Sequence, residues 1–383
     1  MPTSKSTLQF HLAIALGVVF VLVAIGTPNA KDDVPTLDDF WNKKAHFALV
    51  QPAPIIPGQG HREAFAVLRP DIGAQTIYLY YRCRTADIPP RYQICLAISS
   101  DNGASYPIEE GVMITPEDNH PFAVAPSVAK VRDRWVMVYE EGGAPSGTLW
   151  AESVDGIRWN KKGAIASNDR IYKATPSLYP YQDSVYVFYA LGNPTGSNHL
   201  SISYSVGQDM IDLRPYANGD IFTGKLAWDK GSVSMPRVIF DGATHWLFFE
   251  GATQDQRCEG NNVYGWGIAK STDLKTWVEF ADNPIAQSND SESCGMDLPQ
   301  PVRLSSGAIA VYHTSDDVTN VLMATLRFGS TCLAWQTNPN WKEKNYQCIL
   351  SCGGLGGSSC QNTKTCVNAS RLGTSWDCAS CCK

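Results

Sequence analysis

Acidic side chains recur at the boundaries of short apolar runs along this 383-residue chain. Glu63 comes just before the run AFAVL, and Asp297 comes just before LPQPVRL. Glu140 and Glu250 follow aromatic-rich runs, in VMVYEEG and LFFEG. Two carboxyl groups that face one cavity are enough in principle for acid–base hydrolysis, because one can donate a proton while the other accepts one. The candidate chemistry is therefore acid–base hydrolysis, provided that the fold brings such groups together.

Other reaction types have little support. No GxSxG, HExxH or phosphate-loop motif is present. The seven His residues share no metal-ligand spacing. The net charge is −6 and no basic run appears, which argues against nucleic acid as a partner. We expect no metal site and no cofactor.

The elements that must position the carboxyl groups are repeated. A proline, a short apolar run, a polar turn and an aromatic-rich run recur with 13 positions between proline and aromatic. The copies are Pro126 to Tyr139, Pro176 to Tyr189, Pro236 to Phe249 and Pro299 to Tyr312. A looser copy at 65–81 comes first, and each copy is followed by a third run. The runs are rich in β-branched and aromatic residues and are bounded by turn residues, which indicates strands.

The repetition predicts an all-β fold, a five-bladed β-propeller that spans residues 31–336. A many-stranded sandwich is the alternative, but it does not explain the constant spacing. Residues 31–60 are expected to wrap the outside or close the ring. Asp101, Asp155 and Asp273 follow the third run of three copies in Ser-x-Asp turns, and we expect them to fix turns rather than to catalyse.

The two ends of the chain differ from the repeats. Residues 12–26 are apolar and uncharged, and they are short for a bilayer span of about 20 residues. Residues 1–30 are therefore expected to be a secretory signal peptide, with an uncleaved anchor as the alternative. Of 12 cysteines, eight lie between Cys332 and Cys382, so 337–383 is expected to be a small disulfide-rich tail. A cap is favoured over an independent binding module.

Secretion also sets expectations for single residues. Cys83 could bridge to Cys95 across a hairpin, and Cys258 to Cys294. Asn289 and Asn368 have the form of N-glycosylation acceptors. We expect a secreted, extracellular monomer with no stable membrane span after signal cleavage.

The repeat resembles the five-bladed propeller glycosidases: the arabinanase/β-xylosidase family (glycoside hydrolase family 43) and its invertase and mannoside-phosphorylase relatives. The AP, TP and MP openings, the YEEG and FFEG strand ends and the S-x-DG-x-x-W type of turn carry the likeness, over residues 55–336. The resemblance implies a glycan or oligosaccharide substrate at the mouth of the propeller channel. In the arabinanase type it implies two Asp and one Glu beside the prolines of the first, third and fourth blades.

The sequence departs from that set of acids. Glu63 stands where the first-blade Asp is expected, Thr175 at the Asp place of the third blade, and Ser234 at the Glu place of the fourth. Glu63 and Asp297 remain acidic at the mouth, so we predict them as the catalytic pair, with Glu250 as a further acid. The residues predicted to bind substrate are Arg62, Glu140, Lys173, Thr175, Ser234, Arg237 and His313.

Three functions stay open on this reasoning. The first is a secreted glycoside hydrolase that acts on glycans by carboxylate acid–base hydrolysis in the channel. The second is a carbohydrate-binding propeller without catalysis, and the third is an extracellular scaffold for protein partners. Ordinary structural roles are also open: Glu63 could pair with Arg62, Asp297 with Arg303, and Glu140 and Glu250 could be polar strand ends.

Overall fold

The computed structural model describes the chain in segments: 34–50, 64–68, 70, 74–86, 88–142, 147–165, 173–192, 199–254, 264–288, 298–314 and 321–328. The chain divides into two compact units, Met1–Asp33 and Val34–Lys383, and all described residues belong to the second. The predicted signal peptide and cysteine-rich tail lie outside the described residues. Within the described segments, no helix is long and apolar enough to span a membrane.

The described part of the chain is almost entirely strand, as predicted, and its strands pair as antiparallel meanders in chain order. The first two meanders are β2 (Ala64–Leu68), β3 (Ile77–Arg84), β4 (Tyr92–Ser99), β5 (Ile108–Ile114), and β6 (Phe122–Val131), β7 (Arg134–Gly142), β8 (Gly147–Ser153), β9 (Asn160–Ala164). A single parallel bridge between Tyr92 and Phe122 joins these two into one sheet.

Two more meanders follow, and a third is completed by the start of the chain. They are β10 (Lys173–Tyr181), β11 (Ser184–Gly192), β12 (Leu200–Gly207), β13 (Arg214–Pro215), then β14 (Ser232–Phe240), β15 (His245–Ala252), β16 (Tyr264–Ser271), β17 (Val278–Glu279), then β19 (Gln300–Arg303), β20 (Ile309–Thr314), β21 (Val321–Phe328). Strand β1 (Ala45–Leu49), which follows the short helix α1 (Leu37–Trp41), pairs with β21 as its outer neighbour, and β18 (Ala286–Ser288) pairs with β16. An N-terminal strand therefore completes the last sheet, in keeping with the expectation for residues 31–60.

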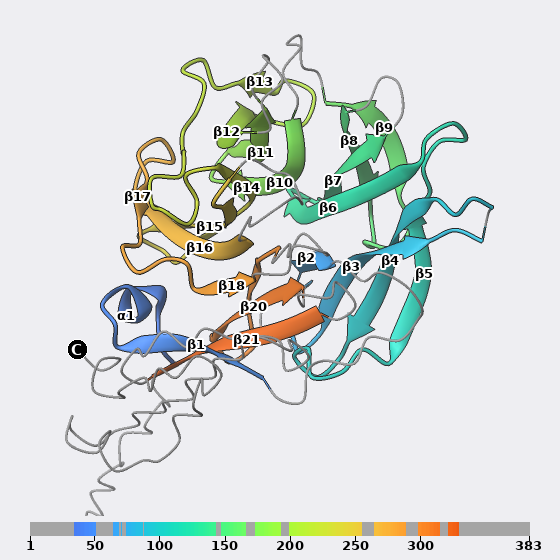
Figure 1. Ribbon diagram of the computed structural model, residues 1–383. Helices are drawn as coiled ribbons and strands as arrows, with labels where there is room; N and C mark the ends of the chain where they lie inside the picture. The colour runs from blue at the N-terminus through green and yellow to red at the C-terminus, as the bar shows by residue number, and fades with distance from the viewer. Residues whose placement is uncertain are drawn as a thin grey trace, which may run out of the picture. The chain divides into compact units, whose positions relative to one another are not determined.

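The first strands of the meanders meet in a ring. Strand β2 contacts β6, β6 contacts β10, β10 contacts β14, β14 contacts β19, and β19 contacts β2. Figure 1 shows β2, β6, β10 and β14 grouped at the middle of the described strands, with later strands of each meander further out. This arrangement is that of a β-propeller, in which first strands line the centre.

Apolar clusters fill the junctions between neighbouring meanders. One cluster joins the first and second meanders through Tyr80 and Tyr139, and another joins the third and fourth through Phe188 and Phe249. These side chains are 0% exposed. Large buried aromatic surfaces stabilise such junctions strongly, and Tyr139 and Phe249 are the aromatic residues that end two copies of the repeat.

The turns between outer strands behave as predicted. The Ser153 hydroxyl donates to Asp155 Oδ1 at 2.9 Å, and that carboxylate accepts the backbone N–H groups of Ile157 and Arg158. The turns at Asp101 and Asp273 have the same Ser-to-Asp bond, at 2.7 and 3.0 Å. Their structural role is confirmed. Cys83 and Cys95 form a disulfide between β3 and β4, with Cα atoms 5.9 Å apart, whereas Cys258 and Cys294 lie outside the described residues.

Candidate active site

Each repeated proline follows a residue with an unusual backbone. The φ angles are 52° at Ala125, 52° at Thr175, 50° at Met235 and 36° at Leu298. Positive φ is uncommon for residues with a side chain, and more so for a β-branched one such as Thr. In β6, β10 and β14 a β-bulge accompanies this conformation. The repeat therefore encodes a bent start of each first strand, where a bulge can redirect side chains and free backbone N–H groups.

The bends bring the meanders together at one place. Ala125, Met235 and Leu298 form a small apolar cluster with Val124. The backbone N–H of Met235 donates to Thr175 Oγ1 at 3.2 Å, which ties β14 to β10. The starts of four first strands thus converge, and the side chains around this point are the candidates for chemistry.

Glu140 lies beside this point and is partly exposed. It pairs with Val124 across the β6–β7 ladder, and the backbone N–H of Thr175 donates to its Oε1. Burial raises the pKa of Glu140 to about 7, although the Thr175 hydrogen bond and the positive charge of Arg237 act in the opposite direction. A carboxyl group with a pKa near neutrality can hold a proton at pH 6–7 and release it to a substrate, which is what a general acid requires.

Glu250 occupies the equivalent position on β15. Both residues follow the aromatic of the repeat, and each pairs with the residue two positions before a repeated proline. Glu250 is 0% exposed, and the hydroxyl of Ser234 donates to its Oε1 at 3.0 Å. Ser234, predicted to stand in place of an acid, therefore binds an acid from the neighbouring strand.

Arg237 is buried beneath the strand starts, at 5% exposure. Its Nε donates to Gln300 Oε1 at 2.7 Å, and one terminal nitrogen donates to the carbonyls of Pro176 and Pro236 at 3.2 and 2.8 Å. These contacts join β10, β14 and β19. Burial lowers the pKa of Arg237 to about 9, and the negative charge of Glu140 opposes that shift. The guanidinium therefore holds the first strands together and places a positive charge near Glu140.

The other predicted residues divide into two groups. His313, at 5% exposure, stands at the repeat position of Glu140 and Glu250, and its ring lies 6.2 Å from that of Trp266. The first copy of the repeat places Arg82 there, 4.4 Å above the Tyr92 ring; sequence reasoning overlooked it, although the position after the repeat aromatic would have identified it. The predicted residues outside the described part of the chain are Arg62, Glu63, Asp297, Asn289, Asn368 and the side chain of Lys173.

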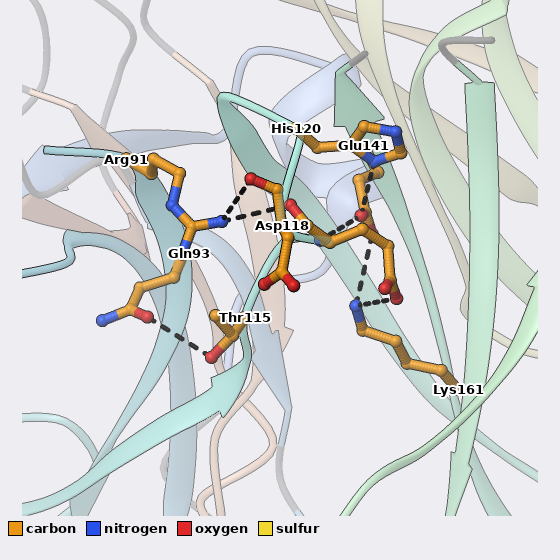
Figure 2. A network of polar contacts seen from close by, with 8 residues as sticks. Arg91, Gln93, Thr115, Asp118, His120, Glu141 and Lys161 are labelled. Atoms are coloured by element: carbon orange, nitrogen blue, oxygen red, sulfur yellow. Dashed lines mark hydrogen bonds and ion pairs between the residues drawn. The ribbon is translucent and has the colours of Figure 1, made fainter. Parts of the chain in front are cut away.

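A second polar group surrounds Glu141, the next residue on β7 (Figure 2). Its Oε1 accepts the backbone N–H of Glu117 at 2.6 Å and lies 2.8 Å from Nδ1 of His120. Lys161 Nζ lies 3.6 Å from the other carboxylate oxygen and 2.8 Å from Glu117 Oε1. Arg91 donates to the carbonyl of Glu117 at 3.1 Å. The residues around His120 in the sequence give no sign of this contact, because its partner Glu141 lies 21 positions away.

Comparisons with known proteins identify the fold. No protein-family model matches the chain, and no curated protein matches it. A solved structure described as a glycoside hydrolase has a TM-score of 0.57 at 13% identity, and the match covers 78% of this chain and 97% of that one. A structure from the GH130 family, a family of mannoside phosphorylases described as containing glycoside hydrolases, has a TM-score of 0.56 at 16% identity, over 73% and 93% of the two chains.

An α-L-arabinofuranosidase from Lactobacillus brevis has a TM-score of 0.53 at 13% identity, over 69% of this chain and 90% of that one. The structural neighbours are therefore glycoside hydrolases of the propeller clan, as the repeat predicted, and at these identities the likeness establishes the fold.

Proposed function

We propose that this protein is a secreted glycoside hydrolase with a five-bladed propeller fold, whose site lies where the first strands of the blades begin. The observation that carries the proposal is Glu140, a partly exposed residue beside the converging strand starts whose carboxyl pKa is raised by burial to about 7. In this account Glu140 protonates the oxygen of the departing sugar. General acid catalysis of this kind contributes about 100- to 10,000-fold to a rate.

We assign the second carboxylate to Glu63 or Asp297, which lie outside the described residues. Glu63 directly precedes β2 in the sequence, and Asp297 directly precedes Leu298, which belongs to the apolar cluster at the converging strand starts. Either would serve as the base or nucleophile that a two-carboxylate hydrolysis needs. Glu250 is fully buried under Ser234, so we assign it a positioning role rather than contact with substrate.

The residues predicted to bind sugar are mostly buried partners of the acids. Thr175 is 8%, Ser234 2% and Arg237 5% exposed. They fix the carboxylates and the strand starts, and we assign them that task. The substrate is a glycan, and the structural neighbours point to furanosides of arabinose and to β-linked mannosides as the first compounds to try.

A carbohydrate-binding propeller without catalysis is the second candidate. It is favoured by Thr175 and Ser234, which stand where the resemblance to arabinanases places acids. Binding and hydrolysis differ in one respect: hydrolysis needs an acid and a second carboxylate, whereas binding needs neither.

The test is sugar release from a panel of aryl glycosides and oligosaccharides that includes arabinofuranosides and β-1,2-mannosides, between pH 4 and pH 8. Turnover by the parent protein, abolished in Glu140→Gln and in one of Glu63→Gln or Asp297→Asn, supports the hydrolase. Saturable glycan binding without any turnover supports the second candidate instead. If the protein shows neither glycan binding nor turnover on any compound of the panel, both candidate functions are overturned.

A further inference from the structure

His120 and Glu141 form a pair that the proposed hydrolysis does not use. Their contact is short, 2.8 Å between Nδ1 and Oε1, and the Glu141 side chain is 0% exposed while that of His120 is 20% exposed. A carboxylate accepts but does not donate, so the contact places a proton on Nδ1 of the imidazole. A buried carboxylate that holds one ring nitrogen in this way fixes both the tautomer and the orientation of the ring.

The second ring nitrogen is directed away from the carboxylate. Figure 2 shows Nε2 of His120 on the far side of the ring from Glu141. In the neutral ring this nitrogen is an acceptor, and in the protonated ring it is a donor. Either form can hydrogen-bond a hydroxyl group, and the His120 side chain is 20% exposed.

The segment that carries His120 is held on both sides. The carbonyl of Pro121 accepts the backbone N–H of Tyr92 at 3.1 Å, which ties the segment to the first meander. Phe122 packs so closely on Gly142 that a Cβ added to Gly142 would lie 2.3 Å from its ring. The imidazole therefore stands on a fixed support rather than on a free loop.

The pair lies at the same end of β7 as Glu140. Glu140 and Glu141 are consecutive, so their side chains leave opposite faces of the strand. The side chain of Glu140 is directed to Thr175 of the third meander. The side chain of Glu141 is directed to Glu117, in the segment that precedes the second meander. Glu140 and the His120–Glu141 pair therefore lie at the same end of β7, one on each face of the strand.

We propose that His120 binds the hydroxyls of the sugar unit next to the one at Glu140, and that Glu141 is the positioning residue for it. The proposal rests on the proposed function and deepens it, because it makes the site one for oligosaccharides rather than single sugars. His120→Asn separates the two parts of the pair: the Asn amide retains a donor for Glu141, whereas the atom equivalent to Nε2 is lost.

The experiment measures kcat and KM on oligosaccharides of two to six units, of the linkage that the parent protein cleaves best in the panel. For His120→Asn we expect KM for the longer substrates to rise about three- to tenfold, the effect of one lost hydrogen bond. The kcat values and the constants for a single-sugar aryl glycoside should stay within twofold of the parent. Glu141→Gln should shift KM in the same length-dependent way, and His120→Gln, which retains a polar atom near Nε2, should restore part of the loss.

The matched control is Glu152→Gln, since Glu152 pairs with Lys162 at 2.9 Å on the outer strands of the same meander. Thermal unfolding of each variant shows that the fold is retained. KM values for His120→Asn that match the parent at every length would refute the role of His120, and so would an equal loss at every length. Absence of turnover by the parent protein is a different result, because it overturns the proposed function and this inference with it.

Discussion

The backbone N–H of Thr175 donates a hydrogen bond to Oε1 of Glu140, and this bond joins the second strand of one meander to the first strand of the next. Thr175 has a positive φ of 52° and lies within the β-bulge of β10, outside the regular pairing with β11. The unusual backbone before the proline therefore supplies the donor that holds the candidate acid.

The raised pKa of Glu140 predicts how stability depends on pH. The group has a pKa of about 7 in the folded protein, above its ordinary value of 4.5. The folded state therefore binds the proton more tightly than the unfolded state, so the contribution to stability is complete below about pH 4.5 and is lost as pH rises through 7. Glu140→Gln should flatten this fall, which is on the order of 1–3 kcal/mol. Urea unfolding at pH 4.5 and pH 7.5 checks it, and an equal pH dependence in parent and variant would contradict it.

Arg237 should matter to both stability and acidity. Arg237→Lys loses the branched contacts to Gln300 and to the two proline carbonyls, so we expect the free energy of unfolding to fall by about 2–4 kcal/mol. Arg237→Met also removes the positive charge near Glu140, which should move the alkaline limb of the activity profile to higher pH. An unchanged profile in a folded Arg237→Met protein would show that this charge does not act on Glu140.

The turn between β10 and β11 offers a test of the backbone. Gln182 is exposed and has a φ of 53°, at the first central position of a two-residue hairpin turn. Glycine adopts this conformation without strain, so Gln182→Gly should stabilise the protein by about 0.5–1 kcal/mol. The control is Asp183→Gly at the next residue. Because Asp183 lacks a positive φ, this substitution should leave stability unchanged or lower it. Denaturant midpoints compare the two, and stabilisation by Asp183→Gly alone would contradict this account of the turn.

The pattern of prolines and aromatics was enough to predict the meanders, their order and the place where they converge. It was enough because the proline, the turn and the aromatic lie within 13 positions of one another. The contacts of Arg237 could not be predicted in this way, since they depend on three strands that lie far apart in sequence. The role of Ser234 could not be predicted either, because its hydroxyl reaches Glu250 only through the pairing of β14 with β15. The predicted pair of Glu63 and Asp297 stays a prediction.

Close packing at the end of β7 predicts a further destabilising change. A Cβ on Gly142 would lie 2.3 Å from the Phe122 ring, whereas a Cβ on Gly147 would meet nothing within 4 Å. Gly142→Ala should therefore lower the free energy of unfolding by about 1–3 kcal/mol, and Gly147→Ala should change it little. Chemical denaturation of both variants is the measurement. Equal effects of the two substitutions would mean that Phe122 does not pack on β7 as described.

The central claim is that Glu140 protonates the leaving oxygen. A proton donor matters for a sugar or alkyl leaving group, but not for dinitrophenolate, which departs without protonation. Glu140→Gln should therefore lose about 100- to 10,000-fold in kcat/KM on the oligosaccharide, while it stays near the parent on the matching dinitrophenyl glycoside. Glu110→Gln, on the exposed strand β5, should match the parent on both. An equal loss on both substrates, or no loss on either, would contradict the assignment of Glu140 as the acid.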